Sequence, residues 1–517
     1  MTHVQAIPVT SLALARISSL VDSDQMRAAE EAAQIARARL AGRVFWSVSS
    51  TARGGGVAEM LPTLIAYARG AGIDARWLVI EGTPDFFRVT KRLHHALHGS
   101  GGGGTPLGDA ERNLYDDVLR ANAKELEGII RPHDVVVLHD PQTAGLAPHL
   151  IRHGAVVIWR CHIGSDQPNE QTELGWSFLR PYLTDIPALV FSRAAYIPPW
   201  CERERTAIIQ PSIDPFSAKN QELDEGTVRA ILVHAGLVEG PSDDGLPTFF
   251  RADGTPGRVD RQADIIRLGR APSWDVPLVV QISRWDPLKD HLGVMQGFAE
   301  LVDGTAPAGA ELVLAGPNVN AVADDPEGAA VFNEILGAWR QLSHADRRRI
   351  HLVNLPMTDA EENAAIVNAL QRHAAVVVQK SLHEGFGLTV TEAMWKGRPV
   401  VASATGGIQD QIADGIHGLL VVDPYDLRAF GAAVRRLLED RPFAEQLGCN
   451  ARQRARVEYL GVRHLLQYEQ LLAHVESWPE LGQLSADGSL DQRGVDTVEA
   501  PDGAADAEAG RGVSDDP

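Results

Sequence analysis

The chain of 517 residues is too long for one hydrophobic core, which predicts two domains. Its formal net charge of −20 argues against nucleic acid or an anionic membrane as a partner. The three cysteines, Cys161, Cys201 and Cys449, share no short spacing, so neither a disulfide framework nor a zinc site is expected, and a cytoplasmic location is favoured. No signal-peptide pattern begins the chain, and no apolar run reaches the roughly 20 residues of a membrane helix.

The first 40 residues are predicted to be a helical extension without a strand, with a helix over 22–40. Short apolar runs then alternate with helical patterns, which is typical of buried parallel strands joined by helical crossovers. The first predicted strands are 44–50, 75–82, 134–140 and 155–162. They indicate a first domain over 41–270, with an irregular segment at 236–262 and a hinge at 270–277.

The same alternation restarts near residue 271. The second set of predicted strands comprises 277–285, 310–317, 349–355, 374–381 and 399–404. Because a parallel sheet must be covered on both faces, we expect an α/β fold with two Rossmann-like doubly wound lobes facing a cleft. The second domain is predicted at 271–460, followed by a helix at 461–484 and a disordered acidic tail at 485–517.

The stretch SLHEGFGLTVTEAM (381–394) places two glycines between a predicted strand and a helix. A helix start with free N–H groups is an anion site, and glycine allows the backbone to approach a ligand closely. Glu384 and Glu392 are eight positions apart, about 12 Å along a helix, whereas a retaining glycosidase pair needs about 5 Å. Two separated carboxylates around an anion site suit a nucleotide-sugar. The alternative is a capped helix with one surface glutamate.

Two further segments follow predicted strands. Arg284 and Lys289 lie five positions apart around a proline turn and could neutralise a diphosphate. Gly54, Gly55 and Gly56 stand between a strand and a helix, where they could cradle a phosphate or a sugar. Taken alone, Arg284 and Lys289 are better explained as part of a polar surface loop, and a single glycine run often has no binding role.

At two strand ends of the first domain, the sequence places a group of polar residues: His139, Asp140, Gln142, Arg160 and His162. A single histidine at such a place is usually structural, but two with an aspartate at adjacent strand ends indicate a site. His94 and His98 have metal-pair spacing on a helix, yet no acid completes a binding motif. No metal or other cofactor is expected.

In combination, Gly54 to Gly56, Arg284 with Lys289, and Glu384-x7-Glu392 resemble the retaining GT-B glycosyltransferases, and the resemblance spans roughly 40–475. Four further segments look like the trehalose synthase branch of that family: 86–99, 139–146, 159–166 and 210–220. The resemblance implies transfer of glucose from ADP-glucose or UDP-glucose to glucose, giving α,α-trehalose. Trehalose phosphorylases look similar and form one alternative, and a nucleotide-sugar-binding module without catalysis forms another.

The resemblance also implies roles for individual residues. Glu392 would bind the ribose, Glu384 the donor glucose, and Arg284 with Lys289 the diphosphate. The other expected donor-binding residues are Gly54, Gly55, Gly56, Gly385, Phe386, Gly387 and Leu388. His162 would lie by the reacting sugar, and the expected acceptor-binding residues are His139, Asp140, Gln142 and Arg160. His162, Asp140, Glu384, Arg284 and Lys289 form the predicted catalytic set.

The chain departs from the family pattern at one place, because His94-His95 and Leu97-His98-Gly99 stand where His-Asn and Leu-Gln-Gly are expected. In this class, retention is attributed to attack on the same face of the sugar within an ion pair, which agrees with the long spacing of the two glutamates. The expected partners are the nucleotide-sugar and glucose. A homodimer is compatible with the sequence, which offers no apolar patch on which to place it.

Overall fold

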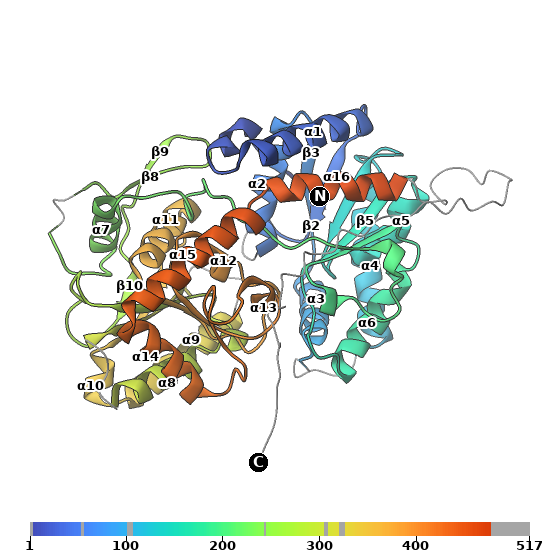
Figure 1. The fold of residues 1–517 in the computed structure, drawn as a ribbon. Coiled ribbons are helices and arrows are strands. Elements are labelled where there is room, and N and C mark those ends of the chain that lie inside the picture. The colour runs from blue at the N-terminus through green and yellow to red at the C-terminus, as the bar shows by residue number, and fades with distance from the viewer. Residues whose placement is uncertain are drawn as a thin grey trace, which may run out of the picture. The chain divides into compact units, whose positions relative to one another are not determined.

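The computed structural model describes residues 4–52, 56–100, 107–241, 245–303, 309–319 and 326–476 (Figure 1). Gly54, Gly55 and the predicted tail at 485–517 lie outside these residues. Within the described ranges, no helix is both long and apolar enough to cross a membrane.

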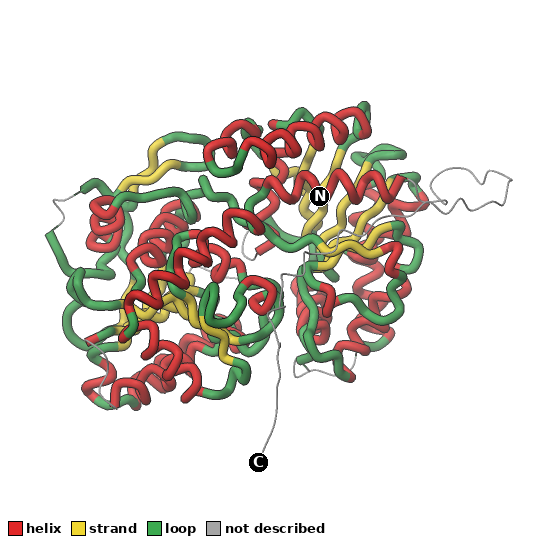
Figure 2. The backbone as a smooth tube through the Cα atoms, viewed as in Figure 1, coloured by secondary structure: helices red, strands yellow, loops and turns green. Residues whose placement is uncertain are grey.

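The first sheet has seven strands in the order β1-β3-β2-β4-β5-β6-β7. Figure 2 shows strands in yellow with helices in red around them. The bounds of the seven strands are β1 (Val4–Ile7), β2 (Phe45–Ser49), β3 (Ala75–Ile80), β4 (Val135–His139), β5 (Val156–Cys161), β6 (Ala188–Phe191) and β7 (Thr206–Ile208). All neighbours are parallel except β1, which pairs antiparallel with β3. The four strands predicted in this half are present as β2 to β5, because runs such as VVVLH are buried on both faces. We call this sheet and its helices the first lobe.

β1 corrects the expectation that the first 40 residues contain no strand. It has four residues, too few for a clear pattern, and it forms only because the exposed edge of β3 offers hydrogen-bonding partners. The helix predicted over 22–40 is present as α1 (Ser23–Arg39), where the Asp22 carboxylate accepts a hydrogen bond from the Gln25 N–H at 2.8 Å.

Helices cover both faces of the first sheet. They are α2 (Gly56–Gly70), α3 (Pro84–Leu97), α4 (Asp109–Leu126), α5 (Ala147–Arg152) and α6 (Glu170–Leu183), with the short turns η1 (Leu14–Ser19), η2 (Ala144–Leu146), η3 (Ala194–Tyr196) and η4 (Arg203–Arg205). Along the chain, the segment that joins the two sheets forms α7 (Glu225–His234) and a small hairpin of β8 (Thr248–Phe250) and β9 (Pro256–Arg258). The hairpin lies in the segment 236–262, which was predicted to be irregular throughout. Its two strands have three residues each, too short for a visible alternation.

The second sheet also has seven strands, in the order β10-β13-β12-β11-β14-β15-β16. Their bounds are β10 (Asp264–Ile266), β11 (Leu278–Ile282), β12 (Glu311–Pro317), β13 (Ile350–Leu355), β14 (Val376–Gln379), β15 (Val400–Ser403) and β16 (Leu419–Val421). Only β10 is antiparallel to its neighbour. The five predicted strands are confirmed as β11 to β15. This sheet and its helices form the second lobe.

The helices of the second lobe complete the fold. They are α8 (His291–Asp303), α9 (Pro326–Gln341), α10 (His344–Arg347), α11 (Ala360–His373), α12 (Leu388–Trp395), α13 (Ile408–Gln411), α14 (Leu427–Glu439) and α15 (Arg441–Glu458), with the turn η5 (Pro287–Lys289). The last described helix, α16 (Val462–Glu476), returns to the first lobe and lies beside α1 (Figure 1). There Leu471, Leu472 and Val475 join a core with residues of β4 and β5.

Candidate active site

The loop between β14 and α12, residues 380–387, forms the centre of the candidate site, and we call it the glycine loop. Gly387 adopts a left-handed conformation (φ 87°) directly before α12 begins, which an L side chain would strain. A Cβ added to Gly385 would lie 3.0 Å from the carbonyl oxygen of His162. The loop of the second lobe therefore touches the strand end of the first lobe at the residue predicted to lie by the reacting sugar.

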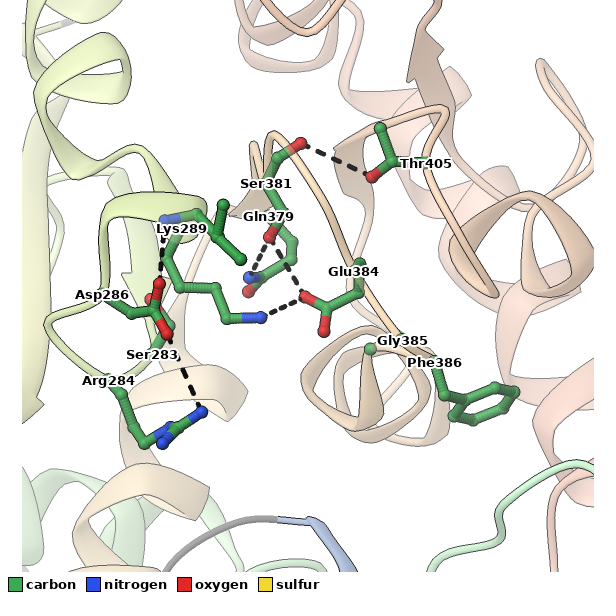
Figure 3. Close-up of polar contacts among 12 residues, drawn as sticks. Ser283, Arg284, Asp286, Lys289, Gln379, Ser381, Glu384, Gly385, Phe386 and Thr405 are labelled. Carbon is green, nitrogen blue, oxygen red and sulfur yellow. Dashed lines mark hydrogen bonds and ion pairs between the residues drawn. The ribbon is translucent and has the colours of Figure 1, made fainter. Parts of the chain in front are cut away.

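Glu384 is held by neighbours from both sides of the loop (Figure 3). Its carboxylate forms an ion pair with the Lys289 ammonium at 2.6 Å and accepts a hydrogen bond from the Ser381 hydroxyl at 3.1 Å. The Gln379 side-chain amide in turn donates to the Ser381 hydroxyl at 2.9 Å. The structure thus brings together two predicted site residues that are 95 positions apart, and it orients the carboxylate before any ligand is bound.

Arg284 lies farther out than Lys289. Its side chain is 55% exposed, and its guanidinium is 3.8 Å from the Asp286 carboxylate, away from Glu384 (Figure 3). A long, exposed arginine can reach an anion that enters from solvent and grip it with two N–H groups. The two predicted diphosphate ligands therefore differ in this structure, since Lys289 is paired and Arg284 is accessible.

Glu392 is buried on α12 and faces a lysine from the first half of the chain. Lys219 lies 3.3 Å from the Glu392 carboxylate and 2.9 Å from Glu59 of α2. Burial raises the pKa of Glu392, and the charge of Lys219 opposes that shift. Gly56 begins α2 close by, because a Cβ added there would lie 3.2 Å from the Leu388 side chain. The starts of α2 and α12 thus meet at Gly56, and the ligand-binding role of the glycine run stays a prediction.

His139 and His162, which we call the histidine pair, are stacked with ring centroids 5.5 Å apart, and His139 Nδ1 is 3.2 Å from His162 Nε2. Burial, together with the charge of Arg160, lowers the pKa of His139 to about 3 and that of His162 well below its usual value. Both rings are therefore neutral at physiological pH. His139 Nε2 is buried without a hydrogen-bond partner among the described residues.

Asp140 supports the histidine pair from the turn after β4. Its backbone is left-handed (φ 62°), and its carboxylate accepts a hydrogen bond from the His162 backbone N–H at 2.8 Å. Burial raises the pKa of Asp140 to about 7, although that hydrogen bond and Arg160 oppose the shift. In this arrangement the carboxylate fixes the backbone of His162.

Gln142 and Arg160, the other two residues expected to bind the acceptor, differ in their hydrogen bonds. The Gln142 side-chain oxygen is buried and has no hydrogen-bond partner among the described residues, so it is free to accept one from a ligand. Arg160 is fully buried and donates to the Tyr468 hydroxyl at 2.6 Å and to the Ile209 carbonyl at 3.2 Å. Its guanidinium thus ties α16 to the first sheet through its two terminal nitrogens, and the acceptor-binding role expected from the sequence stays a prediction.

Comparison with known proteins adds to this geometry. The family described as "Trehalose synthase, N-terminal domain" matches residues 47–198, and "Glycosyl transferases group 1" matches 275–454. A trehalose synthase from Pyrococcus horikoshii is 34% identical over 454 residues, covering 88% of this chain and 94% of that protein. The chain is a glycosyltransferase of the trehalose synthase family.

More distant relatives agree with this family. A trehalose phosphorylase from Pleurotus pulmonarius is 26% identical over 435 residues, 78% of this chain and 53% of that protein. The structure of an α,α-trehalose-phosphate synthase (UDP-forming) from Burkholderia xenovorans superposes with a TM-score of 0.62 at 16% identity, covering 84% of this chain and 100% of that one. At 16% identity, this structural similarity shows the fold alone, and it confirms the two-lobed GT-B architecture expected from the motifs.

Two further histidines, His94 and His98, lie close to the candidate site, although the sequence alone assigned them no role. His94 of α3 and His98, which directly follows that helix, have ring centroids 4.7 Å apart, and His98 Nδ1 is buried without a partner among the described residues. Burial and the charge of Lys289 lower the pKa of His98 to about 4, with Glu384 opposing. His98 therefore lies within electrostatic reach of Glu384 in the glycine loop. Among the described residues, no cluster of three or more His, Cys, Asp or Glu side chains could hold a metal.

Proposed function

We propose that this protein is a retaining glucosyltransferase that moves glucose from ADP-glucose or UDP-glucose to a second glucose and forms α,α-trehalose. One observation carries the proposal: the glycine loop of the second lobe meets the histidine pair of the first lobe, with Gly385 against the His162 carbonyl and Glu384 paired with Lys289. A nucleotide-sugar bound to the second lobe would then present its sugar to the first lobe. The relatives named trehalose synthase support this choice of product.

In the proposed reaction, the bond between the anomeric carbon of the donor glucose and the diphosphate oxygen breaks, and its electron pair stays on the diphosphate. A new bond forms between that carbon and the anomeric oxygen of the acceptor glucose, on the same face of the donor ring. The proton of the acceptor hydroxyl passes to the departing phosphate oxygen. Lys289 and Arg284 stabilise the negative charge that grows on the leaving group.

The sugar side of the proposed site combines the Glu384 carboxylate with neutral groups. Glu384 would accept hydrogen bonds from the donor glucose, and the uncharged histidine pair would bind hydroxyls near the reacting carbon. Gln142, with its unpartnered oxygen, would bind the acceptor. The two cations take the place that a metal ion would otherwise fill at the diphosphate, so we propose that the reaction needs no metal.

Phosphorolysis is the second candidate, and the similarity to a fungal trehalose phosphorylase is the observation that favours it. The same two cations would then hold inorganic phosphate, and trehalose plus phosphate would give glucose 1-phosphate and glucose.

A product assay separates these functions. Purified protein is incubated with glucose and either ADP-glucose or UDP-glucose in phosphate-free buffer, and NMR is used to detect a non-reducing disaccharide. Formation of α,α-trehalose supports the synthase, and the two rates identify the preferred donor. Glucose 1-phosphate formed from trehalose and phosphate, without use of either donor, supports the phosphorylase instead. Binding of a nucleotide-sugar with neither product would overturn both and leave a binding module.

A further inference from the structure

Tyr196 connects the first lobe to the glycine loop. It ends the short turn η3 after β6, and its ring is 2% exposed within the core of the first lobe. A Cβ added to Gly164 would lie 2.2 Å from Cγ of this ring, so the backbone after β5 lies flat against it. The ring is therefore clamped on the side of the first lobe, and its hydroxyl extends from a rigid base.

The hydroxyl points at the backbone of the glycine loop. It lies 2.9 Å from the carbonyl oxygen of Glu384 and 2.6 Å from that of Gly385, and its single proton is shared between these two acceptors. The Gly385 carbonyl also accepts a hydrogen bond from the Gly407 N–H at 3.0 Å. Three segments thus meet at one point, since Gly407 belongs to the loop that follows β15.

The meeting point leaves no room for a side chain. A Cβ on Gly406 would lie 1.7 Å from the Glu384 carbonyl oxygen and 2.7 Å from the Tyr196 hydroxyl. Such close approach restricts how far the glycine loop can shift while the hydroxyl is in place. A buried hydroxyl needs a hydrogen-bond partner, and among the described residues the Tyr196 hydroxyl finds its acceptors in the other lobe.

We propose that Tyr196 is a positioning residue, which fixes the glycine loop from the first lobe and thereby sets the direction of the Glu384 carboxylate. The residue whose carbonyl it holds is the same residue whose side chain pairs with Lys289. The expected effect of Tyr196 on kinetics rests on the proposed function, whereas its effect on the position of the glycine loop does not.

Asp166 provides a second arm from the first lobe. Its carboxylate accepts hydrogen bonds from the Gly406 N–H at 2.7 Å and from the Gln409 side-chain amide at 2.8 Å. Arg193 forms ion pairs with Asp166 and, at 3.0 Å, with Asp410. Tyr196 therefore holds the loop after β14, and Asp166 holds the loop after β15.

The test is Tyr196→Phe, which keeps the clamped ring and removes only the hydroxyl. Tyr182→Phe is the matched control, because the Tyr182 hydroxyl donates to Asp116 at 2.6 Å within the first lobe. Hydrogen exchange is measured by mass spectrometry on the ligand-free protein, in peptides covering 381–391. We expect severalfold faster exchange in Tyr196→Phe and wild-type exchange in Tyr182→Phe. Equal exchange in both variants would overturn the proposal.

Kinetics give the second readout. In Tyr196→Phe, kcat/KM for the nucleotide-sugar should fall about tenfold, as for the loss of one hydrogen bond, while KM for the acceptor glucose stays at its wild-type value. An equal rise in both KM values would indicate a merely structural role and count against positioning. If the wild type forms no trehalose, the proposed function fails and hydrogen exchange alone decides the role of Tyr196.

Asp166→Asn should speed exchange in peptides covering 404–411 rather than 381–391.

Discussion

The two halves of the candidate site use opposite electrostatics. In the second lobe, Glu384 of the glycine loop forms a charged pair with Lys289 of η5, and the exposed Arg284 lies nearby. In the first lobe, the histidine pair is buried, and burial lowers the pKa of both rings until they are neutral. The two halves touch where Gly385 meets the His162 carbonyl.

The difference follows from what each half has to bind under the proposed function. A departing diphosphate gains negative charge, which fixed cations stabilise. Sugar hydroxyls carry no charge, and neutral imidazoles supply directed donors and acceptors without the free-energy cost of burying an ion. Under the proposed function, the cations of the second lobe therefore lie where charge develops, and the histidines that would bind sugar hydroxyls are uncharged.

The largest effect is expected from Glu384→Gln, which keeps the shape of the side chain and removes its charge. Lys289 then loses the partner that holds it at 2.6 Å, and the donor glucose loses a charged acceptor. We expect kcat to fall about 100-fold or more, with an unchanged circular-dichroism spectrum. Glu445→Gln is the control, since Glu445 pairs with Arg441 on the exposed face of α15. Turnover near the wild-type rate would remove Glu384 from the site.

Lys289→Met removes the other charge of the ion pair that Lys289 forms with Glu384. It removes the cation and keeps most of the stem, so the nucleotide-sugar KM should rise about tenfold or more. Lys289→Arg is the companion variant and should recover part of the loss, because it restores the charge. If both variants behave alike, the length of the side chain matters rather than its charge.

His162→Phe tests the neutral half. The aromatic ring keeps its stacking on His139, while the ring nitrogens are lost. Loss of one neutral hydrogen bond predicts a decrease of about tenfold in kcat/KM. The matched control is His149→Phe on α5, whose ring contacts Arg152 at the surface. A loss as large as that of Glu384→Gln would show that the first lobe contributes more than neutral hydrogen bonds.

The smallest effect concerns stability. The pKa of Asp140 is raised by burial to about 7 from the ordinary 3.8, so between these values the folded protein holds a proton that the unfolded chain has lost. The wild type therefore loses stability as the pH rises through this window, by at most about 1.4 kcal/mol per pH unit. Asp140→Asn does not titrate and tolerates the left-handed backbone.

Unfolding by urea at pH 5 and pH 8 measures this difference. Relative to wild type, Asp140→Asn should be more stable at pH 8 than at pH 5. Asp24→Asn, at an exposed position on α1, should show no such trend. A constant difference between Asp140→Asn and wild type at both pH values would contradict a raised pKa for Asp140.

Much of the fold was predictable because its central strands are buried on both faces. Runs such as VVVLH in β4 and VVVQ in β14 are too apolar and β-branched to lie elsewhere. The edge strands escaped prediction, since β1 and β10 have only four and three residues. Their pairing is decided by the free edge of a neighbouring strand rather than by their own pattern.

The chain by itself determined the glycine loop, because a strand end, two glycines, two glutamates and a helix start are contiguous, and local backbone geometry links them. Only the tertiary structure decided which distant groups meet this loop. Lys219 beside Glu392, the Tyr196 hydroxyl on the Glu384 carbonyl, and Arg160 turned toward α16 all join segments far apart in the sequence. Such contacts depend on how two independently formed sheets come together, and no local pattern encodes that.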